Sequence, residues 1–162
     1  MQEKVALFPG SFDPFTVGHE SIVLRGLDLF DHIIIAIGYN STKRSLYPLD
    51  TRLRMINKVF EGNSRVSVKS YQGLTVDLCK SIHVHFIIRG LRTAADFEFE
   101  RAIAQVNRMM DKEMESVFLL TSPELTPVNS TIVRDILVHG GDATMFIPSS
   151  INIGDYAHEM NR

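Results

Sequence analysis

The stretch His32-Ile-Ile-Ile-Ala-Ile-Gly38 decides the fold of this chain. Its central residues, 33–37, form an unbroken apolar run, and a strand points successive side chains to opposite faces of its sheet. A strand that is apolar on both faces is typical of a parallel sheet with helices on both sides. The run is also far too short to cross a bilayer.

Short apolar segments bounded by turn residues or charges recur on both sides of this stretch, and they predict four more strands. These are Lys4 to Phe8, Arg65 to Ser70, His85 to Ile88 and Glu115 to Leu120. Windows with helical spacing separate them, such as Leu53, Ile56 and Phe60, although the window Leu74 to Ile82 is shorter. Strand and helix therefore alternate, which predicts an α/β fold: a doubly wound five-stranded parallel sheet with helices on both faces. We expect a single domain covering residues 1–162.

Composition restricts the compartment and the partners. With 162 residues, 44% of them hydrophobic, the chain can fill a core. Its net charge of -2 provides no general attraction for nucleic acid or an anionic membrane, so neither partner is expected. Pro9-Gly10 interrupts the first apolar run, which argues against a signal peptide, and the single cysteine, Cys79, fits a reducing compartment. We therefore expect a cytoplasmic protein in which Cys79 is buried and not catalytic.

The C-terminal segment after Gly140-Gly141 is loosely amphipathic. It contains Phe146, Ile147, Ile151, Ile153 and Tyr156. It can form a terminal helix packed on the sheet or a contact between subunits, and the sequence favours neither.

Ligands of an open parallel sheet bind beyond the carboxyl ends of its strands. The first such loop begins Pro9-Gly-Ser-Phe-Asp-Pro14 and runs into a helix whose free N–H groups suit a phosphate. His19 falls in the first turn of that helix, three residues after Thr16, where its imidazole can donate a hydrogen bond to a phosphoryl oxygen. A helix cap at Thr16 beside a surface histidine explains the same residues, and this short motif alone favours that simpler interpretation.

Two arginines end the fourth predicted strand, in the sequence Arg89-Gly-Leu-Arg92. The two N–H groups of an arginine match the geometry of a phosphate, and Gly90 lets a ligand approach the backbone. For a single arginine, a charged and solvent-exposed turn at the strand end would be the simpler interpretation. On the next helix, Glu100 and Asn107 share a face about 10 Å apart along the axis. Glu100 can simply interact favourably with the positive end of the helix dipole. Asn107 can equally well hydrogen-bond a polar ligand or a buried backbone group.

A helix after the fifth strand is predicted to begin at Asn129 or Ser130 and to run to about Val138. Helix capping alone accounts for its first residues, but their free N–H groups and hydroxyls would also bind a second phosphate. Lys43, in the loop after the second strand, is either a solvent-exposed residue of a basic loop or a ligand of a phosphate. The residues of these loops that suit a phosphate are Ser11, His19, Lys43, Arg89, Arg92 and Ser130. All of them fall on one edge of the predicted sheet, which predicts a phosphate site there.

The predicted site uses neither of the common glycine-rich nucleotide motifs, since the chain has no Gly-x-x-x-x-Gly-Lys-Ser/Thr and no Gly-x-Gly-x-x-Gly. It also has no carboxylate cluster dedicated to a metal. We therefore expect no protein ligands for a metal, and Mg²⁺ would be held mainly by the phosphates of the substrate.

The motifs on this edge resemble those of a known superfamily. Thr16-Val-Gly-His19 and Asn129-Ser-Thr-Ile-Val-Arg134 are similar to the paired signature of the nucleotidylyltransferases. The segments that resemble bacterial phosphopantetheine adenylyltransferases in particular are Pro9-Gly-Ser-Phe-Asp-Pro14, Ile88-Arg-Gly-Leu-Arg92, Asp96-Phe-Glu-Phe-Glu100 and Asn107-Arg108. The resemblance covers nearly the whole chain, and it implies a Rossmann-like nucleotidylyltransferase fold. It also implies a reaction in which ATP and 4'-phosphopantetheine give dephospho-coenzyme A and pyrophosphate.

The resemblance further implies direct in-line attack of the acceptor phosphate on the α-phosphorus of ATP, without a covalent intermediate. The implied catalytic residues are His19, which would stabilise the transition state, Lys43 and Arg89. The implied phosphopantetheine-binding residues are Ser11, Lys43, Leu74, Thr75, Arg89 and Asn107. The implied ATP-binding residues are Ser11, Phe12, His19, Gly90, Leu91, Arg92, Glu100, Leu125, Thr126, Pro127, Val128, Asn129, Ser130 and Thr131. The family also implies Mg²⁺ and a homohexamer.

The chain departs from the family pattern in the segment that would hold ATP. Asn129 replaces the first serine of the second signature, and Leu125 and Pro127 occupy a segment where relatives often carry an aromatic residue near the adenine. These differences leave the adenine contacts open and do not change the implied reaction.

Other functions remain possible from the sequence. One is another adenylyl- or cytidylyltransferase, such as one acting on glycerol phosphate or nicotinamide mononucleotide, although Arg89, Arg92 and Asn107 favour phosphopantetheine. Another is a non-catalytic nucleotide-binding protein, although binding alone does not need His19, Lys43 and Arg89 together. A nucleic-acid-binding module fits least, because the basic residues form no stripe interleaved with aromatic side chains.

Overall fold

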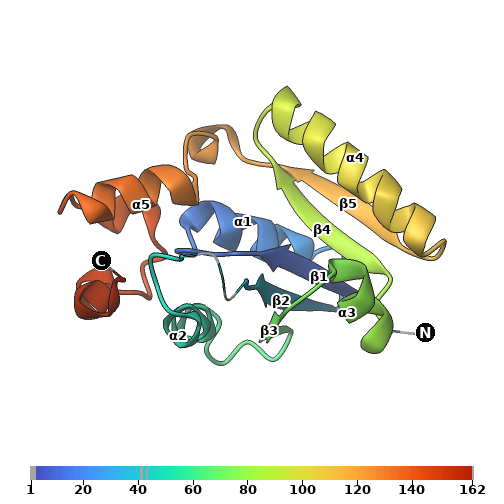
Figure 1. The fold of residues 1–162 in the computed structure, drawn as a ribbon, viewed down its shortest axis with the longest axis horizontal. Coiled ribbons are helices and arrows are strands. Elements are labelled where there is room, and N and C mark those ends of the chain that lie inside the picture. The colour runs from blue at the N-terminus through green and yellow to red at the C-terminus, as the bar shows by residue number, and fades with distance from the viewer. Residues whose placement is uncertain (1–2, 41, 43, 162) are drawn as a thin grey trace.

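Five parallel strands form one sheet in the order β3-β2-β1-β4-β5 (Figure 1). The structure is a computed structural model that describes residues 3–40, 42 and 44–161. The strands are β1 (Val5–Gly10), β2 (His32–Gly38), β3 (Val66–Tyr71), β4 (Phe86–Leu91) and β5 (Glu115–Leu120). The α-helices are α1 (Val17–Gly26), α2 (Leu49–Val59), α3 (Thr75–Ser81), α4 (Ala94–Met110) and α5 (Ser130–Val138). Three 3₁₀ helices follow β5: η1 (Pro123–Leu125), η2 (Thr144–Phe146) and η3 (Ile153–Glu159).

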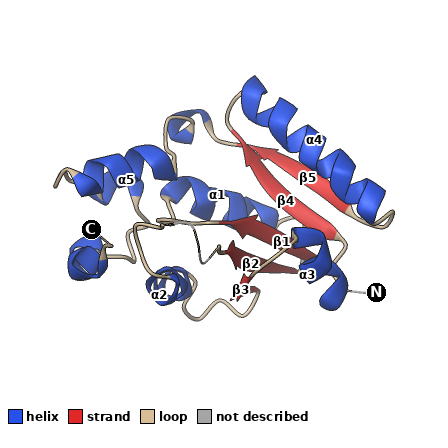
Figure 2. Cartoon of the chain, in the orientation of Figure 1, coloured by secondary structure: helices blue, strands red, loops and turns tan. Residues whose placement is uncertain are grey.

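Helices lie on both faces of the sheet, which confirms the predicted α/β fold (Figure 2). On one face, Ile33 and Ile35 of β2 are fully buried and belong to the same apolar cluster as Ile56 of α2 and Val23 of α1. The opposite face carries a second apolar cluster with α3, in which Cys79 is completely buried, as predicted. Burying one such aliphatic side chain contributes roughly 1.5–3 kcal/mol, so a strand that is apolar on both faces stabilises helices packed on both sides of the sheet.

Strands β1 and β4 separate toward their carboxyl ends. β1 pairs with β2 along its whole length, from Val5 to Gly10. Within the described residues, its register with β4 consists of Ala6 opposite Phe86 and Leu7 opposite Ile87. The strand order reverses between these two strands, and the resulting crevice is where an open α/β sheet places its ligands.

Two strands extend further than the sequence predicts. β1 ends at Gly10 and β4 at Leu91, whereas the apolar runs end at Phe8 and Ile88. Pro9 fits in β1 because its carbonyl points toward β4 and accepts a hydrogen bond from Arg89. A residue's N–H and C=O lie on the same side of a strand, so the missing N–H of Pro9 falls where β4 has already turned away.

The C-terminal segment packs beside α2 and α5 rather than on the sheet. Ile147 and Ile151 are buried in one apolar cluster with Met55 of α2 and Val133 of α5. Glu159 of η3 forms an ion pair with Arg54 of α2. None of the helices in the described ranges is both long enough and apolar enough to cross a membrane.

Candidate active site

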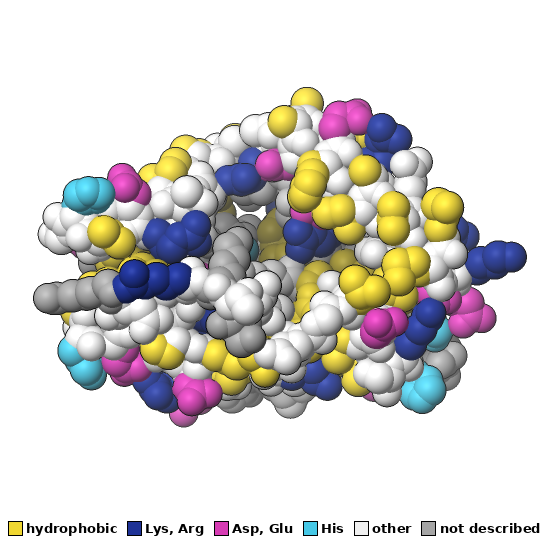
Figure 3. Space-filling model, viewed as in Figure 1, with side chains coloured by type: hydrophobic (Ala, Val, Ile, Leu, Met, Phe, Trp, Pro, Cys, Tyr) yellow, Lys and Arg dark blue, Asp and Glu magenta, His cyan; other side chains and the backbone are white. Residues whose placement is uncertain are grey.

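A cleft of about 320 Å³ opens at the carboxyl ends of β1 and β4, where these strands separate. Figure 3 shows a hollow on this face with Lys and Arg side chains beside it. The β1 side supplies Phe8, Pro9, Gly10, Ser11, Phe12, Thr16, Gly18, His19 and Ile22. The β4 side supplies Arg89, Gly90, Arg92, Asp96 and Glu100, and the segment leading into α5 supplies Thr121, Val128, Asn129, Ser130 and Thr131.

A second pocket of about 310 Å³ adjoins the cleft and shares part of its wall. The shared residues are Pro9, Gly10, Ser11, Arg89 and Glu100. Beyond them the second pocket is lined by Gly38, Tyr71, Thr75, Ile87, Ile103, Ala104, Asn107 and Ser116. Two cavities that meet at a serine hydroxyl and an arginine suit two ligands that react with each other at the junction.

Helix α1 holds His19 by a capping box. Thr16 is the N-cap residue, and its hydroxyl accepts a hydrogen bond from the backbone N–H of His19. In return, the backbone N–H of Thr16 donates to Nδ1 of His19 over 3.0 Å. Because Nδ1 is the acceptor, a neutral imidazole carries its proton on Nε2, and that N–H remains available as a donor.

Aromatic rings pack around the imidazole of His19, which is partly buried and lines the cleft, so it is not an exposed surface histidine. The ring centroids of Phe12 and Phe15 lie 5.0 and 5.3 Å from that of the imidazole, and Phe8 lies 6.2 Å away. Desolvation, followed by the positive charges of Arg89 and Arg92, lowers the pKa of His19 to about 3. The imidazole is therefore neutral at pH 7 and acts as a hydrogen-bond donor without a formal charge.

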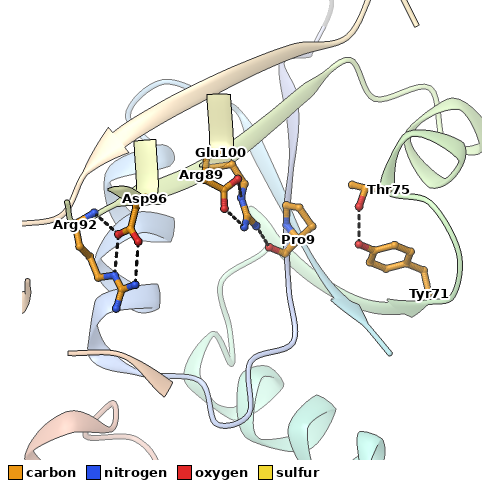
Figure 4. A network of polar contacts seen from close by, with 7 residues as sticks. All are labelled: Pro9, Tyr71, Thr75, Arg89, Arg92, Asp96 and Glu100. Carbon is orange, nitrogen blue, oxygen red and sulfur yellow. Dashed lines mark hydrogen bonds and ion pairs between the residues drawn. The ribbon is translucent and has the colours of Figure 1, made fainter. Parts of the chain in front are cut away.

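Arg89 in β4 and Arg92 just after it are each paired with a carboxylate of α4 (Figure 4). Arg89 makes two hydrogen bonds to Glu100, one of them from Nε over 2.7 Å, and a third to the carbonyl of Pro9. Arg92 contacts Asp96 through Nε at 3.1 Å and through a terminal nitrogen at 3.2 Å. Desolvation raises the pKa of Asp96, but the hydrogen bonds and charge of Arg92 outweigh it, so the pKa is lowered overall.

The N-terminus of α5 completes the cleft. Asn129 is the N-cap, since its side-chain oxygen accepts from the backbone N–H of Ile132 over 2.9 Å. This decides between the two predicted caps, Asn129 and Ser130, and the helix ends at Val138 as predicted. Ser130 instead donates its hydroxyl to the carbonyl of Pro14 over 2.9 Å, which fastens α5 to the first loop.

The structure brings most of the predicted site residues together. Those that line the cleft or the second pocket are Ser11, Phe12, Thr75, Arg89, Gly90, Arg92, Glu100, Asn107, Val128, Asn129, Ser130, Thr131 and His19. Leu91 does not line either cavity and is buried, and Leu74 is 54% exposed outside both. The residues Leu125, Thr126 and Pro127 precede Val128 in the chain but do not line the cleft. Lys43 lies outside the described residues.

Some lining residues were not anticipated from the sequence. Tyr71 lines the second pocket and its hydroxyl lies 2.8 Å from that of Thr75, and Gly38 faces the Tyr71 ring. Both residues end strands of the predicted edge, so their position was a usable signal. Asp96 is part of the family motif Asp96-Phe-Glu-Phe-Glu100, but nothing in the sequence shows that it would pair with Arg92.

Comparison with known sequences shows the family to which the chain belongs. Residues 7–136 match the model of a family described as "Cytidylyltransferase-like". The chain is 51% identical over 150 residues to a phosphopantetheine adenylyltransferase of Flavobacterium johnsoniae, covering 93% of this chain and 98% of that protein. It is 46% identical over 150 residues to the phosphopantetheine adenylyltransferase of Bacteroides thetaiotaomicron, covering 93% of this chain and 99% of that protein.

Solved structures share the fold at low sequence identity. A putative nicotinate-nucleotide adenylyltransferase from Vibrio parahaemolyticus superposes with a TM-score of 0.67 at 20% identity, over 92% of this chain and 96% of that one. A bifunctional NMN adenylyltransferase/ADP ribose pyrophosphatase from Francisella tularensis gives 0.74 at 14% identity, over 97% of this chain and 49% of that one. At these identities the likeness concerns the fold alone.

Proposed function

The chain belongs to the phosphopantetheine adenylyltransferase family, and we propose that the cleft and the second pocket together form the active site of that reaction. The protein is a nucleotidyltransferase of coenzyme A biosynthesis. It transfers the adenylyl group of ATP to 4'-phosphopantetheine and releases dephospho-coenzyme A and pyrophosphate. The observation that supports this location is the shared wall, because Ser11 and Arg89 line both cavities.

In this proposal ATP occupies the cleft. The cleft is bordered by the N-termini of α1 and α5, which attract phosphate through free N–H groups and the helix dipole. Arg92 adds a guanidinium group, and the β4 backbone at Gly90 offers close approach to a nucleotide.

Phosphopantetheine occupies the second pocket, with its phosphate at Ser11 and Arg89. The wall beyond the junction is apolar at Ile87 and Ile103, which suits the methylene groups and methyls of a pantetheine arm. Asn107 and Thr75 supply the polar groups that the amides of that arm require.

His19 stabilises the transition state as the acceptor phosphate attacks the α-phosphorus in line. Its Nε2–H donates to the phosphoryl oxygen on which negative charge increases, and its capping box holds the donor in place before the reaction. No covalent intermediate is needed, because the two substrates meet directly. Burial raises the pKa of Cys79 to about 11, so this thiol is not a nucleophile for the site.

Mg²⁺ would enter this site with ATP and would be held mainly by the phosphates of the nucleotide. Among the described residues no group of three His, Cys, Asp or Glu side chains is placed to hold a metal. The cleft carboxylates of Asp96 and Glu100 are both paired with arginines, so the donor set fits a metal carried by its substrate. Bound Mg²⁺ would neutralise negative charge on the phosphates of ATP, including the pyrophosphate that leaves.

The enzyme works as a cytoplasmic homohexamer in this proposal. Helix α4 supports an assembly because it exposes large apolar side chains, including Phe99 at 68% and Met109 at 84%. Figure 3 shows hydrophobic side chains gathered over this helix. A single cysteine, buried at Cys79, is consistent with a reducing compartment.

Pyrophosphate release tests the reaction. The protein is assayed with Mg·ATP and phosphopantetheine, with CTP and glycerol phosphate, and with ATP and nicotinamide mononucleotide. Release in the first mixture alone is the expected result. Release in another mixture would overturn the acceptor assignment, and no release in any mixture while ATP still binds would indicate a nucleotide-binding protein without turnover.

A further inference from the structure

Side chains from three other elements hold backbone carbonyls at the end of β1 and in the loop between β1 and α1. Arg89 of β4 donates to Pro9, and Arg134 of α5 donates to Asp13 over 2.9 Å. Arg52 of α2 donates to the carbonyl of Ser11 over 2.7 Å. These contacts fix the orientation of every second peptide group from Pro9 to Asp13, a segment that has no ladder partner on the β4 side.

Arg52 is the most deeply placed of these groups. Its side chain belongs to a residue that is only 5% exposed, and Nε also donates to the carbonyl of Tyr47 over 3.1 Å. Asp13, likewise 5% exposed, accepts the N–H groups of Leu46 and Tyr47 on the same side. A buried arginine is costly unless it is hydrogen-bonded, and here one guanidinium connects two separate loops.

The peptide that Arg52 holds is followed by an unusual backbone conformation. Phe12 has a φ of +45°, in the left-handed region that a bulky side chain rarely adopts. Its ring packs on Phe8 and Phe15 and fills the space next to Gly10, where an added Cβ would lie 2.8 Å from the ring. Ring packing fixes Phe12 from one side, and the Arg52 hydrogen bond fixes the preceding peptide from the other.

A trans peptide is planar and points its C=O and N–H in opposite directions. Since the carbonyl of Ser11 points to Arg52, the N–H of Phe12 points away from Arg52. Arg52 lines a third cavity, which shares Ser11 with the cleft, whereas Phe12 lines the cleft and not that cavity. Within the described part of the chain, the N–H of Phe12 has no acceptor.

We propose that Arg52 is a positioning residue, which holds the Ser11–Phe12 peptide so that the Phe12 N–H donates to a phosphate oxygen of the nucleotide. This inference rests on the proposed placement of ATP in the cleft. Arg52 touches neither substrate and acts through the backbone, so the phosphate-binding donor is set from the opposite side of the loop.

The direct test is the amide signal of Phe12 in a ¹⁵N-labelled protein titrated with inorganic pyrophosphate. In the wild type this signal shifts on binding, as expected for an N–H that gains a charged acceptor. Arg52→Lys keeps the buried charge but lacks the fork that spans two carbonyls, and we expect the affinity reported by the Phe12 amide to fall about tenfold. Because this readout needs no acceptor and no turnover, it stands even if the reaction proposed above fails.

Kinetics separate positioning from stability. We expect Arg52→Lys to lower kcat by roughly 10- to 100-fold and to raise the KM for ATP, while the KM for phosphopantetheine changes little. Arg54→Lys, on the exposed side of the same helix, is the matched charge control. Ile56→Val, which removes one methyl group from the core under α2, supplies a destabilised control without any contact to the loop carbonyls.

Added guanidinium ion provides a rescue in Arg52→Ala, because the space left by the side chain opens into the third cavity. At millimolar concentrations, well below denaturing levels, it should restore part of kcat, and matched sodium chloride should not. The inference is overturned if the Phe12 amide signal reports the same affinity for pyrophosphate in Arg52→Lys as in the wild type. It is equally overturned if kcat falls only in step with melting temperature, as in Ile56→Val.

Discussion

The backbone N–H of Thr16 donates a hydrogen bond to Nδ1 of His19, and this contact sets the chemical form of the imidazole in the cleft. An Nδ1 that accepts leaves the proton on Nε2, so His19 offers one neutral N–H to a phosphate. The same contact caps α1, so the side chain that we propose as the transition-state donor is also a helix-capping residue. The two roles make different demands, and they can be separated by mutation.

Replacing His19 tests the transition-state role. His19→Ala should lower kcat by about 10²- to 10³-fold, the typical loss for one oxyanion donor, with ATP affinity nearly unchanged. Glutamine at the third helical position completes a capping box, so His19→Gln should keep the stability of α1 that His19→Ala loses. Steady-state kinetics, ATP titration and thermal unfolding of both variants check these outcomes. Full recovery of kcat in His19→Gln would show that His19 acts only through the helix cap.

The neutral state of His19 should make stability depend on pH. Its pKa is about 3 in the folded protein and near 6.5 when unfolded, so between these values the unfolded chain binds the extra proton. Stability therefore falls as the pH is lowered from 6.5 toward 3, by on the order of 1–3 kcal/mol at pH 4. Urea unfolding at a series of pH values gives the free energy of unfolding, and we expect it to depend less steeply on pH in His19→Gln than in the wild type. The exposed His139→Gln is the control, and an equal change of slope there would contradict the assignment.

Arg89 should not be replaceable by lysine. Its fork holds Glu100 and the Pro9 carbonyl together, and a single ammonium group cannot make these contacts at once. We expect Arg89→Lys to lower kcat/KM for phosphopantetheine by about 10²-fold. Arg101→Lys, whose parent residue pairs with Glu98 on the exposed face of α4, should leave it unchanged. Wild-type kcat/KM in Arg89→Lys would mean that charge alone suffices at the junction.

Gly10 should tolerate no side chain. A Cβ there would lie 2.8 Å from the buried Phe12 ring, which is itself held by Phe8 and Phe15. Gly10→Ala should therefore cost about 1–3 kcal/mol of unfolding free energy and lower activity at temperatures where the protein stays folded. Gly154→Ala has only an ordinary contact at 3.4 Å and is the matched control. Equal stability of the two variants in urea would show that the Phe12 ring can shift.

The fold was predictable because its signal is local. Residues 33–37 are apolar on both faces, and burial on both faces is what the sheet imposes on β2. The strand ends at Pro9-Gly10 and Arg89-Gly90 were missed for a tertiary reason. Proline and charge normally end a strand, but here β2 and β5 keep their partners paired past the last apolar residue. The position of the C-terminal segment was left open because one of its partners, α2, is far from it in sequence, and no spacing rule brings the two together.

The site was predictable to the extent that it follows strand ends. Knowing that parallel strands share one carboxyl edge was enough to bring His19, Arg89 and Ser130 together. The hydrogen-bond and ion-pair partners of the arginines were not predictable, because no spacing rule links Arg89 to Glu100 or Arg52 to the Ser11 carbonyl. The charge state of His19 likewise depends on three aromatic rings and two arginines that only the folded chain collects.

The short register between β1 and β4 gives the molecule a mechanical seam. Two residue pairs, Ala6 with Phe86 and Leu7 with Ile87, join the part of the sheet that carries His19 to the part that carries Arg89. Beyond them the two strands are linked by the guanidinium of Arg89 on the Pro9 carbonyl and by Ile22 of α1 packed against Gly90 of β4. A substrate that spans the cleft would add a link where the strands no longer pair, so we expect occupancy of the site to stiffen this part of the protein.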